Sequence, residues 1–386
     1  METGWKLSNT CKKGTRMANR RMFLGAIGSA AGILAVRPAA WAQGRKEVFI
    51  AGKRIKTVDI HAHASIKEVE EIIRGTDLER QIGGPRLLDS SRLIMMNEWG
   101  IDVSVISANQ YWWYRTDDRS LATDIIRVQD EGFQAWVNQY PDRFVALTSP
   151  TVQFPDLAAE QLDYAVNELG FRGASMGGHV NGVVPAGPEY DEFWAKAEEL
   201  DVPIFVHPAG SGNIIQQGAL DYAGDLGNII GNPLETTFFL SRLILDGTFD
   251  RFPGLKICGA HGGGYLPSYF GRTDVACDAA GGASINSQGE FIGNDPIQAD
   301  NCRNQKPPRE YLRTQIFADS MVFSDEGLRH LVAEMGPSQV VYGTDMPLGW
   351  PDTMDLIINS TYLNNAEKEA ILGGNLIRIL RIDRAI

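Results

Sequence analysis

The sequence predicts an α/β fold of the (β/α)8 TIM-barrel type, and three observations lead to this prediction. Short apolar runs rich in β-branched residues alternate with longer segments of helical period, as in parallel sheets built from βαβ units. Eight such strand and helix repeats follow one another along the chain. The length of 386 residues, with 44% hydrophobic and 22% charged residues, suits one large domain and excludes a disordered chain or a disulfide-stapled mini-protein.

The expected strands are short and apolar, and they cover residues 57–61, 103–107, 144–149, 173–176, 203–207, 256–260, 315–319 and 340–343. Amphipathic helices are expected between them at 121–139, 157–169, 190–200, 235–245 and 326–335. Helices within 352–380 would close the barrel, and residues 48–55 would form a hairpin across its bottom. Residues 277–308 fit neither period, which indicates an irregular insertion after the sixth strand, on the face where such barrels keep active-site loops.

The charge distribution argues against a nucleic-acid partner. The formal net charge is −12, and seven of the 36 Lys and Arg residues but only one of the 48 acidic residues lie before residue 43. The remainder therefore carries 29 basic and 47 acidic residues, and it contains no basic stripe of the kind that binds phosphates. An anionic substrate would have to be held by local arginines.

The first 42 residues resemble a twin-arginine export signal. Arg20 and Arg21 precede an apolar Gly/Ala-rich stretch, and Ala40 and Ala42 supply the small residues that a signal peptidase reads. A membrane anchor or a buried N-terminal helix is the alternative, although the apolar stretch is shorter than the roughly 20 residues that span a bilayer. We therefore expect a signal at 1–42, a single domain at 43–386, a periplasmic or otherwise exported location and the twin-arginine machinery as a partner.

Three cysteines remain after the signal, an odd number that does not suggest a disulfide framework. Cys277 and Cys302 have the option of pairing across the insertion in an oxidising compartment, and the sequence leaves this open.

Four of the six histidines lie at the end of an expected strand. His61 and His63 are two residues apart, so both side chains would enter the barrel mouth from the first strand. His207 ends the fifth strand and His261 the sixth, while Asp345 follows the eighth. Each residue alone has an ordinary explanation, such as a hydrogen-bonded core histidine or a helix-capping aspartate.

Together these residues predict a metal-dependent active site, because all five would lie on the rim where this fold keeps its active site. Three imidazoles and a carboxylate suit Zn²⁺ or a similar divalent ion, whereas Mg²⁺ and Ca²⁺ prefer oxygen ligands. Asp345 would bind the ion directly or hold a metal-bound water, whose pKa the ion lowers. His261 would lie beside that water as an acid or base.

The sequence resembles the amidohydrolase superfamily, and within it the branch typified by aminocarboxymuconate-semialdehyde decarboxylase. The similarity covers nearly the whole mature chain and rests on long, ordered runs: HAHA, NELGFRGASMGGHVNG, FVHP, NPLETT, FDRFPGLKICGAHGGGYLPSYFGR, VVYGTDMP and GGNLIRIL. The resemblance implies metal ligation by His61, His63, His207 and Asp345, with His261 as the catalytic residue. No lysine ends the fourth strand, which favours one metal ion per site over a binuclear centre.

The resemblance also implies substrate contacts. The arginine eleven residues after the catalytic histidine, here Arg272, would reach a substrate carboxylate from the neighbouring subunit of a homodimer. His179 and Asn181 match the HVN motif of that branch and would position substrate, although a loop-structuring role for His179 is an equal alternative.

The second substrate arginine of that branch cannot be aligned, because the segment after His63 is too short. Arg86 or Arg115 is the candidate replacement. Trp112 and Trp113 beside Arg115 would form an apolar wall for an aromatic or polyene substrate, or would pack against a loop or a subunit.

The leading hypothesis is a zinc-dependent, non-oxidative decarboxylase of a small carboxylated aromatic or unsaturated acid. The same site is also suited to a hydrolase of an ester, lactone or amide that uses a metal-bound hydroxide, and a hydratase of an unsaturated acid is a third candidate. A non-catalytic periplasmic binding or metal-storage protein belongs to a different class. Metal removal discriminates, because a binding protein would keep its ligand affinity whereas an enzyme would lose turnover.

Overall fold

The computed structural model describes residues 44–216, 218–221, 224–277, 284–285, 291–292 and 302–383. The expected export signal at 1–42 lies outside these residues, and so does most of the 277–308 insertion.

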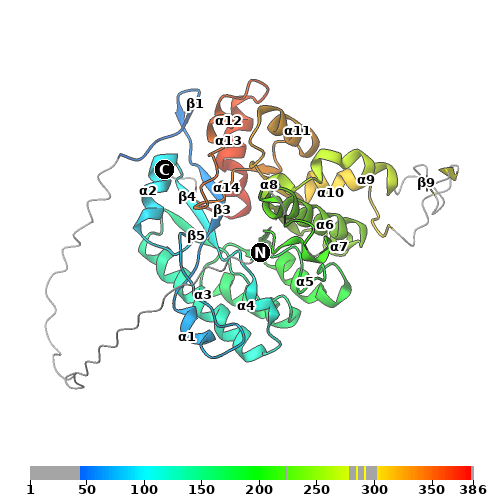
Figure 1. Ribbon diagram of the computed structural model, residues 1–386. Coiled ribbons are helices and arrows are strands. Elements are labelled where there is room, and N and C mark those ends of the chain that lie inside the picture. The colour runs from blue at the N-terminus through cyan, green and yellow to red at the C-terminus, as the bar shows by residue number, and fades with distance from the viewer. Residues whose placement is uncertain are drawn as a thin grey trace, which may run out of the picture. The chain divides into compact units, whose positions relative to one another are not determined.

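Parallel strands form the centre of the described part of the chain (Figure 1). They are β3 (Val58–His63), β4 (Val103–Ser107), β5 (Phe144–Ala146), β6 (Ala174–Met176), β7 (Pro203–Val206), β8 (Lys256–Gly259), β11 (Ile316–Asp319) and β12 (Val340–Val341). The first three pair in the order β3-β4-β5, and the other five pair in the order β6-β7-β8-β11-β12. Each lies within three residues of an expected strand.

Backbone hydrogen bonds across two seams join these sheets into a closed barrel. At the first seam, the amide of Ser175 in β6 donates to the Thr148 carbonyl just after β5, at 2.7 Å. At the second, the amide of His63 in β3 donates to the Met346 carbonyl after β12, at 2.8 Å. The predicted (β/α)8 fold is therefore confirmed, and the carboxyl ends of its strands define the face that carries the site.

Helices cover the outside of the barrel between successive strands (Figure 1). The five expected helices correspond to α3 (Arg119–Gln139), α4 (Pro155–Asn167), α5 (Asp191–Glu199), α6 (Asn232–Leu245) and α11 (Asp325–Met335). Further helices and short helical turns are α1 (Val69–Ile73), η2 (Trp112–Arg115), η3 (Pro188–Tyr190), η4 (Ser211–Asn213), η5 (Gly227–Gly231), α7 (Thr248–Arg251), α8 (Ala260–Gly263), η6 (Pro267–Tyr269), α9 (Phe270–Ala276) and α10 (Pro308–Thr314). None of the helices in the described ranges is both long enough and apolar enough to cross a membrane.

The helix α2 (Ser90–Trp99) was not expected from the periodicity. Its buried stripe is short, because only Arg92, Leu93 and Met96 are buried. The ends of α2 nevertheless carry clear signals. Asp89 caps the first turn by accepting from the Ser91 amide, and Gly100 ends the helix with a φ of 77°.

The amino-terminal end of the barrel is closed by the C-terminal helices. These are α12 (Met354–Ile358), α13 (Asn365–Glu369), η7 (Ala370–Gly374) and α14 (Asn375–Ile379). Leu376 and Leu380 belong to the same buried cluster as Val58 and Phe205 from the barrel strands. The expected hairpin is present as the antiparallel pair β1 (Phe49–Ile50) and β2 (Lys53–Arg54). This apolar plug leaves the opposite end of the barrel for polar chemistry.

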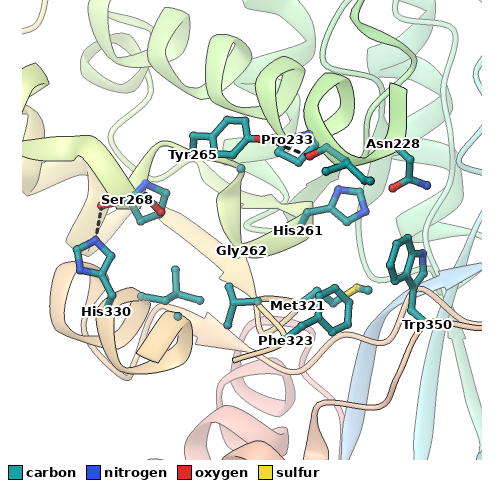
Figure 2. Close-up of a pocket in the computed structure, with 16 residues that line it drawn as sticks. Asn228, Pro233, His261, Gly262, Tyr265, Ser268, Met321, Phe323, His330 and Trp350 are labelled. Atoms are coloured by element: carbon teal, nitrogen blue, oxygen red, sulfur yellow. Dashed lines mark hydrogen bonds between the residues drawn. The ribbon is translucent and has the colours of Figure 1, made fainter. Parts of the chain in front are cut away.

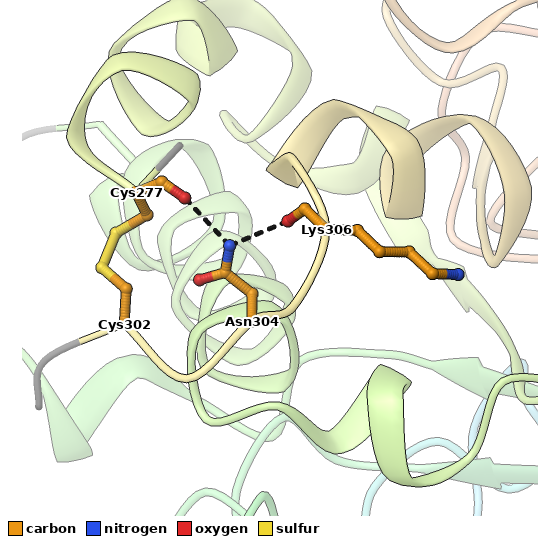
Figure 3. Close-up of a disulfide and its surroundings, with 4 residues drawn as sticks. All are labelled: Cys277, Cys302, Asn304 and Lys306. Carbon is orange, nitrogen blue, oxygen red and sulfur yellow. Dashed lines mark hydrogen bonds between the residues drawn. A yellow bond between two sulfur atoms is a disulfide. The ribbon is translucent and has the colours of Figure 1, made fainter. Parts of the chain in front are cut away.

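The insertion after β8 is less irregular than expected, because β9 (Ser284–Ile285) and β10 (Phe291–Ile292) form an antiparallel pair. A disulfide joins Cys277 to Cys302 with a Cα–Cα distance of 5.8 Å, which answers the question that the sequence leaves open. Figure 3 shows the Asn304 amide donating to the carbonyls of Cys277 and Lys306, both at 2.9 Å. The base of the insertion is thus fixed covalently and by hydrogen bonds.

Candidate functional site

A β-bulge in β3 determines which side chains enter the barrel mouth. Between Asp59 and Ala62, β3 has one more residue than its partner β4. Ile60 therefore packs in the barrel interior, and His61 and His63 still lie on the same side, with ring centroids 5.5 Å apart. The rule that residues two apart lie on the same face of a strand therefore applies to His61 and His63 but not across the bulge.

Four predicted ligand residues come together at the barrel mouth. One ligand atom each from His61, His63, His207 and Asp345 lies within 4.8 Å of the others, and all four residues are buried. Asp345 Oδ1 is 2.6 Å from His63 Nε2 and 3.0 Å from His61 Nε2. Three different strand ends thus contribute to one compact cluster of three imidazoles and one carboxylate.

Outer hydrogen bonds orient two of these rings. His61 Nδ1 donates to Asp319 Oδ2 at 2.7 Å, and His207 Nδ1 donates to the Pro208 carbonyl at 3.0 Å. Both bonds leave Nε2 free to face the centre of the cluster, as carboxylate and carbonyl partners do in metal sites. Asp319 was not singled out from the sequence, although its place at the end of an expected strand was the available signal.

The electrostatics of the cluster call for a cation. Burial opposes a charge on His61, but the carboxylates of Asp345 and Asp319 still raise the pKa of its ring to about 10. Burial likewise opposes ionisation of Asp345, yet the His61 and His63 rings hold its pKa well below the ordinary value. Burial lowers the pKa of His207 well below its usual range. The two buried, ionised carboxylates thus favour a positive charge at His61, and a bound divalent ion would supply that charge in place of the ring proton.

The donor atoms fit such an ion. The buried His61 Nε2 has no hydrogen-bond partner among the described residues. Three imidazole nitrogens and a carboxylate suit Zn²⁺, Mn²⁺ and similar transition ions better than Mg²⁺ or Ca²⁺. The four residues would therefore hold one divalent metal ion.

His261 lies beside this cluster instead of inside it. Its ring centroid is 5.1 Å from that of His61 and 5.4 Å from that of His207, and its Nε2 is 4.0 Å from Asp345 Oδ2. Burial lowers the pKa of His261 to about 4, so the ring is neutral at pH 7. This neutral, partly accessible imidazole is suited to proton transfer next to a metal-bound ligand.

The loop after β8 sets the position of His261 through strained backbone. His261 has a φ of 55°, and the three following glycines also have positive φ values. A Cβ at Gly264 would lie 2.2 Å from the Pro233 carbonyl oxygen, so only glycine fits there. Backbone strain of this kind, next to a cluster of ligands, is typical of a functional site.

A cavity of about 470 Å³ opens in front of His63, His207, His261 and Asp345. Three guanidinium groups line it, from Arg80, Arg86 and Arg115. None of the three forms an ion pair with a carboxylate among the described residues, and Arg86 Nε is buried without a partner. Their positive charge favours an anionic ligand.

Of these arginines, Arg115 was expected from the sequence and Arg86 was its alternative, whereas Arg80 was not recognised. The Arg80 guanidinium stacks over the Trp112 ring, 4.5 Å from its centroid. Burial and the neighbouring Arg115 lower the pKa of Arg80. The two arginines therefore present their charges at the same wall of the cavity.

Trp113 lies away from the cavity, contrary to expectation. It is only 1% exposed and packs in the core cluster outside the barrel. Its neighbours Trp112 and Tyr114 line the cavity instead. The short helical turn η2 explains the difference, because it points successive side chains in different directions.

His179 and Asn181 line the cavity and also hold its loops together. His179 Nε2 donates to the Gly210 carbonyl at 2.7 Å, and its Nδ1 accepts from the Gly182 amide at 3.0 Å. The Asn181 amide donates to the Tyr114 carbonyl. The loop-structuring role that the sequence left open for His179 therefore has direct contacts.

Arg272 is exposed on α9 and does not line this cavity within one chain. The sequence placed it in a site completed by a neighbouring subunit. The contribution of Arg272 to the site of a neighbouring subunit therefore stays a prediction.

Comparisons with known proteins agree with this geometry. Residues 58–382 match the family model described as amidohydrolase. The 2-amino-3-carboxymuconate-6-semialdehyde decarboxylase of Dictyostelium discoideum is 29% identical over 302 residues, which is 76% of each chain. A crystal structure of 2,6-dihydroxybenzoate decarboxylase with 2,6-dihydroxybenzoate aligns with a TM-score of 0.70 and 25% identity, over 85% of this chain and 99% of that one.

A manganese-bound dihydroxybenzoic acid decarboxylase from Polaromonas sp. JS666 has the same fold. It aligns with a TM-score of 0.70 and 24% identity, over 86% of this chain and 98% of that one.

Proposed function

This chain belongs to the amidohydrolase family and is an enzyme of that family, and on this premise we propose that it is a metal-dependent, non-oxidative decarboxylase of a small carboxylated aromatic acid. The observation that carries the proposal is that His261 lines one cavity together with three unpaired arginines and with His63, His207 and Asp345 of the metal cluster. The decarboxylases among the similar proteins support the same reaction class.

The cavity residues account for substrate binding. Arg80, Arg86 and Arg115 would attract and hold an anionic acid, while Trp112 and Tyr111 offer ring surfaces for its aromatic part. The Tyr111 hydroxyl is already engaged by Asn109 and Ser175, so its ring is held in place. An acid bound in this way has its ring carbons within reach of His261.

His261 would carry the proton transfer of the reaction. A proton adds to the ring carbon that carries the carboxylate, the C–C bond breaks, and CO2 leaves. The His261 ring, which burial keeps neutral, would take up a proton from solvent, and the imidazolium formed would deliver that proton to carbon and return to the neutral form in each turnover. When bound at His61, His63, His207 and Asp345, the metal ion would polarise and orient the substrate oxygens.

We propose Zn²⁺ as the native ion, on the strength of the nitrogen-rich donor set. Mn²⁺ is the competing candidate, because the Polaromonas protein contains it. Metal analysis of the protein purified without added metal decides between them.

We also propose that the enzyme works as a homodimer in which Arg272 contributes to the neighbouring site. Its exposed position on α9 leaves its guanidinium accessible to a second chain. Arg272→Ala should raise KM for the acid without changing metal content. An unchanged KM, or a monomeric enzyme of full activity, would contradict this part of the proposal.

Export to the periplasm completes the proposal. The Cys277–Cys302 disulfide supports it, since such bonds persist in oxidising compartments. Fractionation of cells expressing the full chain should find mature protein in the periplasm, and replacement of Arg20 and Arg21 by Lys should retain it in the cytoplasm.

The reaction is tested by measuring CO2 release from a panel of hydroxybenzoic and carboxymuconic acids by the metal-loaded protein, with His261→Ala as the blank. Release above the blank is expected from at least one hydroxybenzoic acid. If no acid releases CO2 while esters or lactones are cleaved, the hydrolase alternative replaces this proposal.

A further inference from the structure

A second cavity, of about 370 Å³, also borders His261 (Figure 2). We call it the apolar chamber. Its walls come from the loops after β7, β8, β11 and β12, and they include Ile229, Tyr265, Met321, Val322, Phe323 and Trp350. His261 and Asn228 line both this chamber and the arginine-containing cavity. A ligand bound at His261 is therefore adjacent to both.

The chamber differs from the arginine-containing cavity in charge. No Asp, Glu, Lys or Arg is found among the described residues that line it. Its polar groups are largely engaged: the Tyr265 hydroxyl donates to the Ile229 carbonyl at 3.1 Å, and His330 Nε2 donates to the Pro267 carbonyl at 3.3 Å. What these walls offer to a ligand is mainly hydrocarbon and aromatic surface.

The rim of the chamber exposes large apolar side chains. Phe323 is 45% exposed and Ile229 is 53% exposed. The Phe323 ring stacks on Trp350 with centroids 5.5 Å apart and an interplanar angle of 28°. Trp350 lines the chamber together with His261 (Figure 2), so the stacked pair borders the same cavity as the reacting centre. Clustered exposed apolar groups of this kind typically contact a ligand.

Phe323 also has a φ of 51°, a left-handed conformation that is unfavourable for a bulky residue. Glycine would relieve this strain, and a polar residue would suit the exposed position better. The phenylalanine is thus both strained and half exposed where it lines the chamber. Contact with a ligand gives it a function.

We propose that the apolar chamber binds an alkyl or aryl substituent of the substrate, so that the substrate spans His261 with its carboxylate toward the arginines. The chamber thus selects substituted aromatic acids over the small parent acids. This inference rests on the proposed decarboxylase function, whose substrate class it narrows.

The test is calorimetric titration of the metal-loaded enzyme with 2-hydroxybenzoate and with its pentyl derivatives, the chain placed at each free ring position in turn. At least one pentyl isomer should bind about 10-fold to 100-fold more tightly than the parent acid, because several methylene groups leave water. CO2 release from each acid is measured in parallel.

Two variants test whether the apolar chamber causes the tighter binding of the pentyl isomer. Val322→Trp fills the chamber and should reduce the preference for the pentyl isomer, relative to the parent acid, to less than about twofold. Phe323→Ala removes one wall and should reduce the preference about threefold or more. Phe49→Ala is the matched control, because Phe49 is 49% exposed in the β1–β2 hairpin and does not line the chamber.

The inference is overturned if no pentyl isomer binds more tightly than the parent acid, or if the preference survives Val322→Trp. It is also overturned if Val322→Trp and Phe323→Ala change only the oligomeric state, which would show that a second copy covers the chamber. A pentyl preference without any CO2 release would instead refute the decarboxylase proposal and leave the chamber as a binding site. CO2 release without the preference refutes the chamber alone.

Discussion

The two cavities that share His261 differ in chemistry and in how readily the sequence reveals them. The arginine-containing cavity holds buried imidazoles, a carboxylate and three guanidinium groups. The apolar chamber has no charged group among its described lining residues. Metal ligation accepts few residue types at fixed strand ends, whereas an apolar wall accepts many. The reacting groups can therefore be recognised in the sequence, whereas the residues of the apolar chamber cannot.

The largest effect is expected when a metal-binding residue is replaced. His63→Ala should lose bound metal and reduce turnover by about four orders of magnitude or more, since both the ion and its positioning are lost. Elemental analysis and CO2 release measure the two effects. A variant that retained stoichiometric metal would remove His63 from the ligand set.

Replacement of His261, which lines both cavities, should reduce turnover much more than substrate binding. His261→Ala is expected to keep its metal and to lose about 10²-fold to 10⁴-fold in kcat, the usual contribution of a general acid or base. Binding of the parent acid should change little by comparison. Unchanged turnover would exclude His261 as the proton donor.

The hydrogen bond from Asp319 to His61 provides a smaller test on the metal side. Asp319→Asn keeps the shape but weakens the acceptor, and metal affinity should fall by about 10-fold to 100-fold. Competition with a chelator gives the affinity. An affinity equal to that of the unmodified enzyme would show that the His61 ring needs no carboxylate partner.

The smallest effect is expected at the cavity wall. Arg80→Gln should raise KM for hydroxybenzoic acids by about tenfold, because one of three guanidinium groups is lost. The preference for the pentyl isomer should stay as it is, since Arg80 does not line the chamber. A change in that preference would mean that the two cavities do not act independently.

The fold and the metal ligands were predictable because each rests on a period or on a restricted residue type. The barrel followed from alternating apolar runs, and His61, His63, His207 and Asp345 followed from their places at strand ends. The bulge in β3 was not predictable, since a register shift depends on pairing with β4. The bulge changes the face of β3 to which the residues before His61 point, but His61 and His63 still lie on the same side.

The substrate contacts were predicted less well, because they lie on loops whose course no period describes. Trp113 turned into the core, and Arg80 reached the cavity from a segment without a recognisable pattern. Asp319 was overlooked because an aspartate that ends a strand has several ordinary roles. Loop conformation, which tertiary contacts decide, determined the outcomes for Trp113 and Arg80.

The most direct test of the decarboxylase assignment is the fate of the proton at carbon. The metal-loaded enzyme is incubated in D2O with the hydroxybenzoic acid that it turns over fastest, and the product is analysed by NMR and mass spectrometry. We expect one deuterium at the carbon that carried the carboxylate, CO2 released in equal amount, and both products formed about 10²-fold to 10⁴-fold more slowly by His261→Ala. A product without a new C–D bond, or an equal rate of incorporation by His261→Ala, would contradict the assignment.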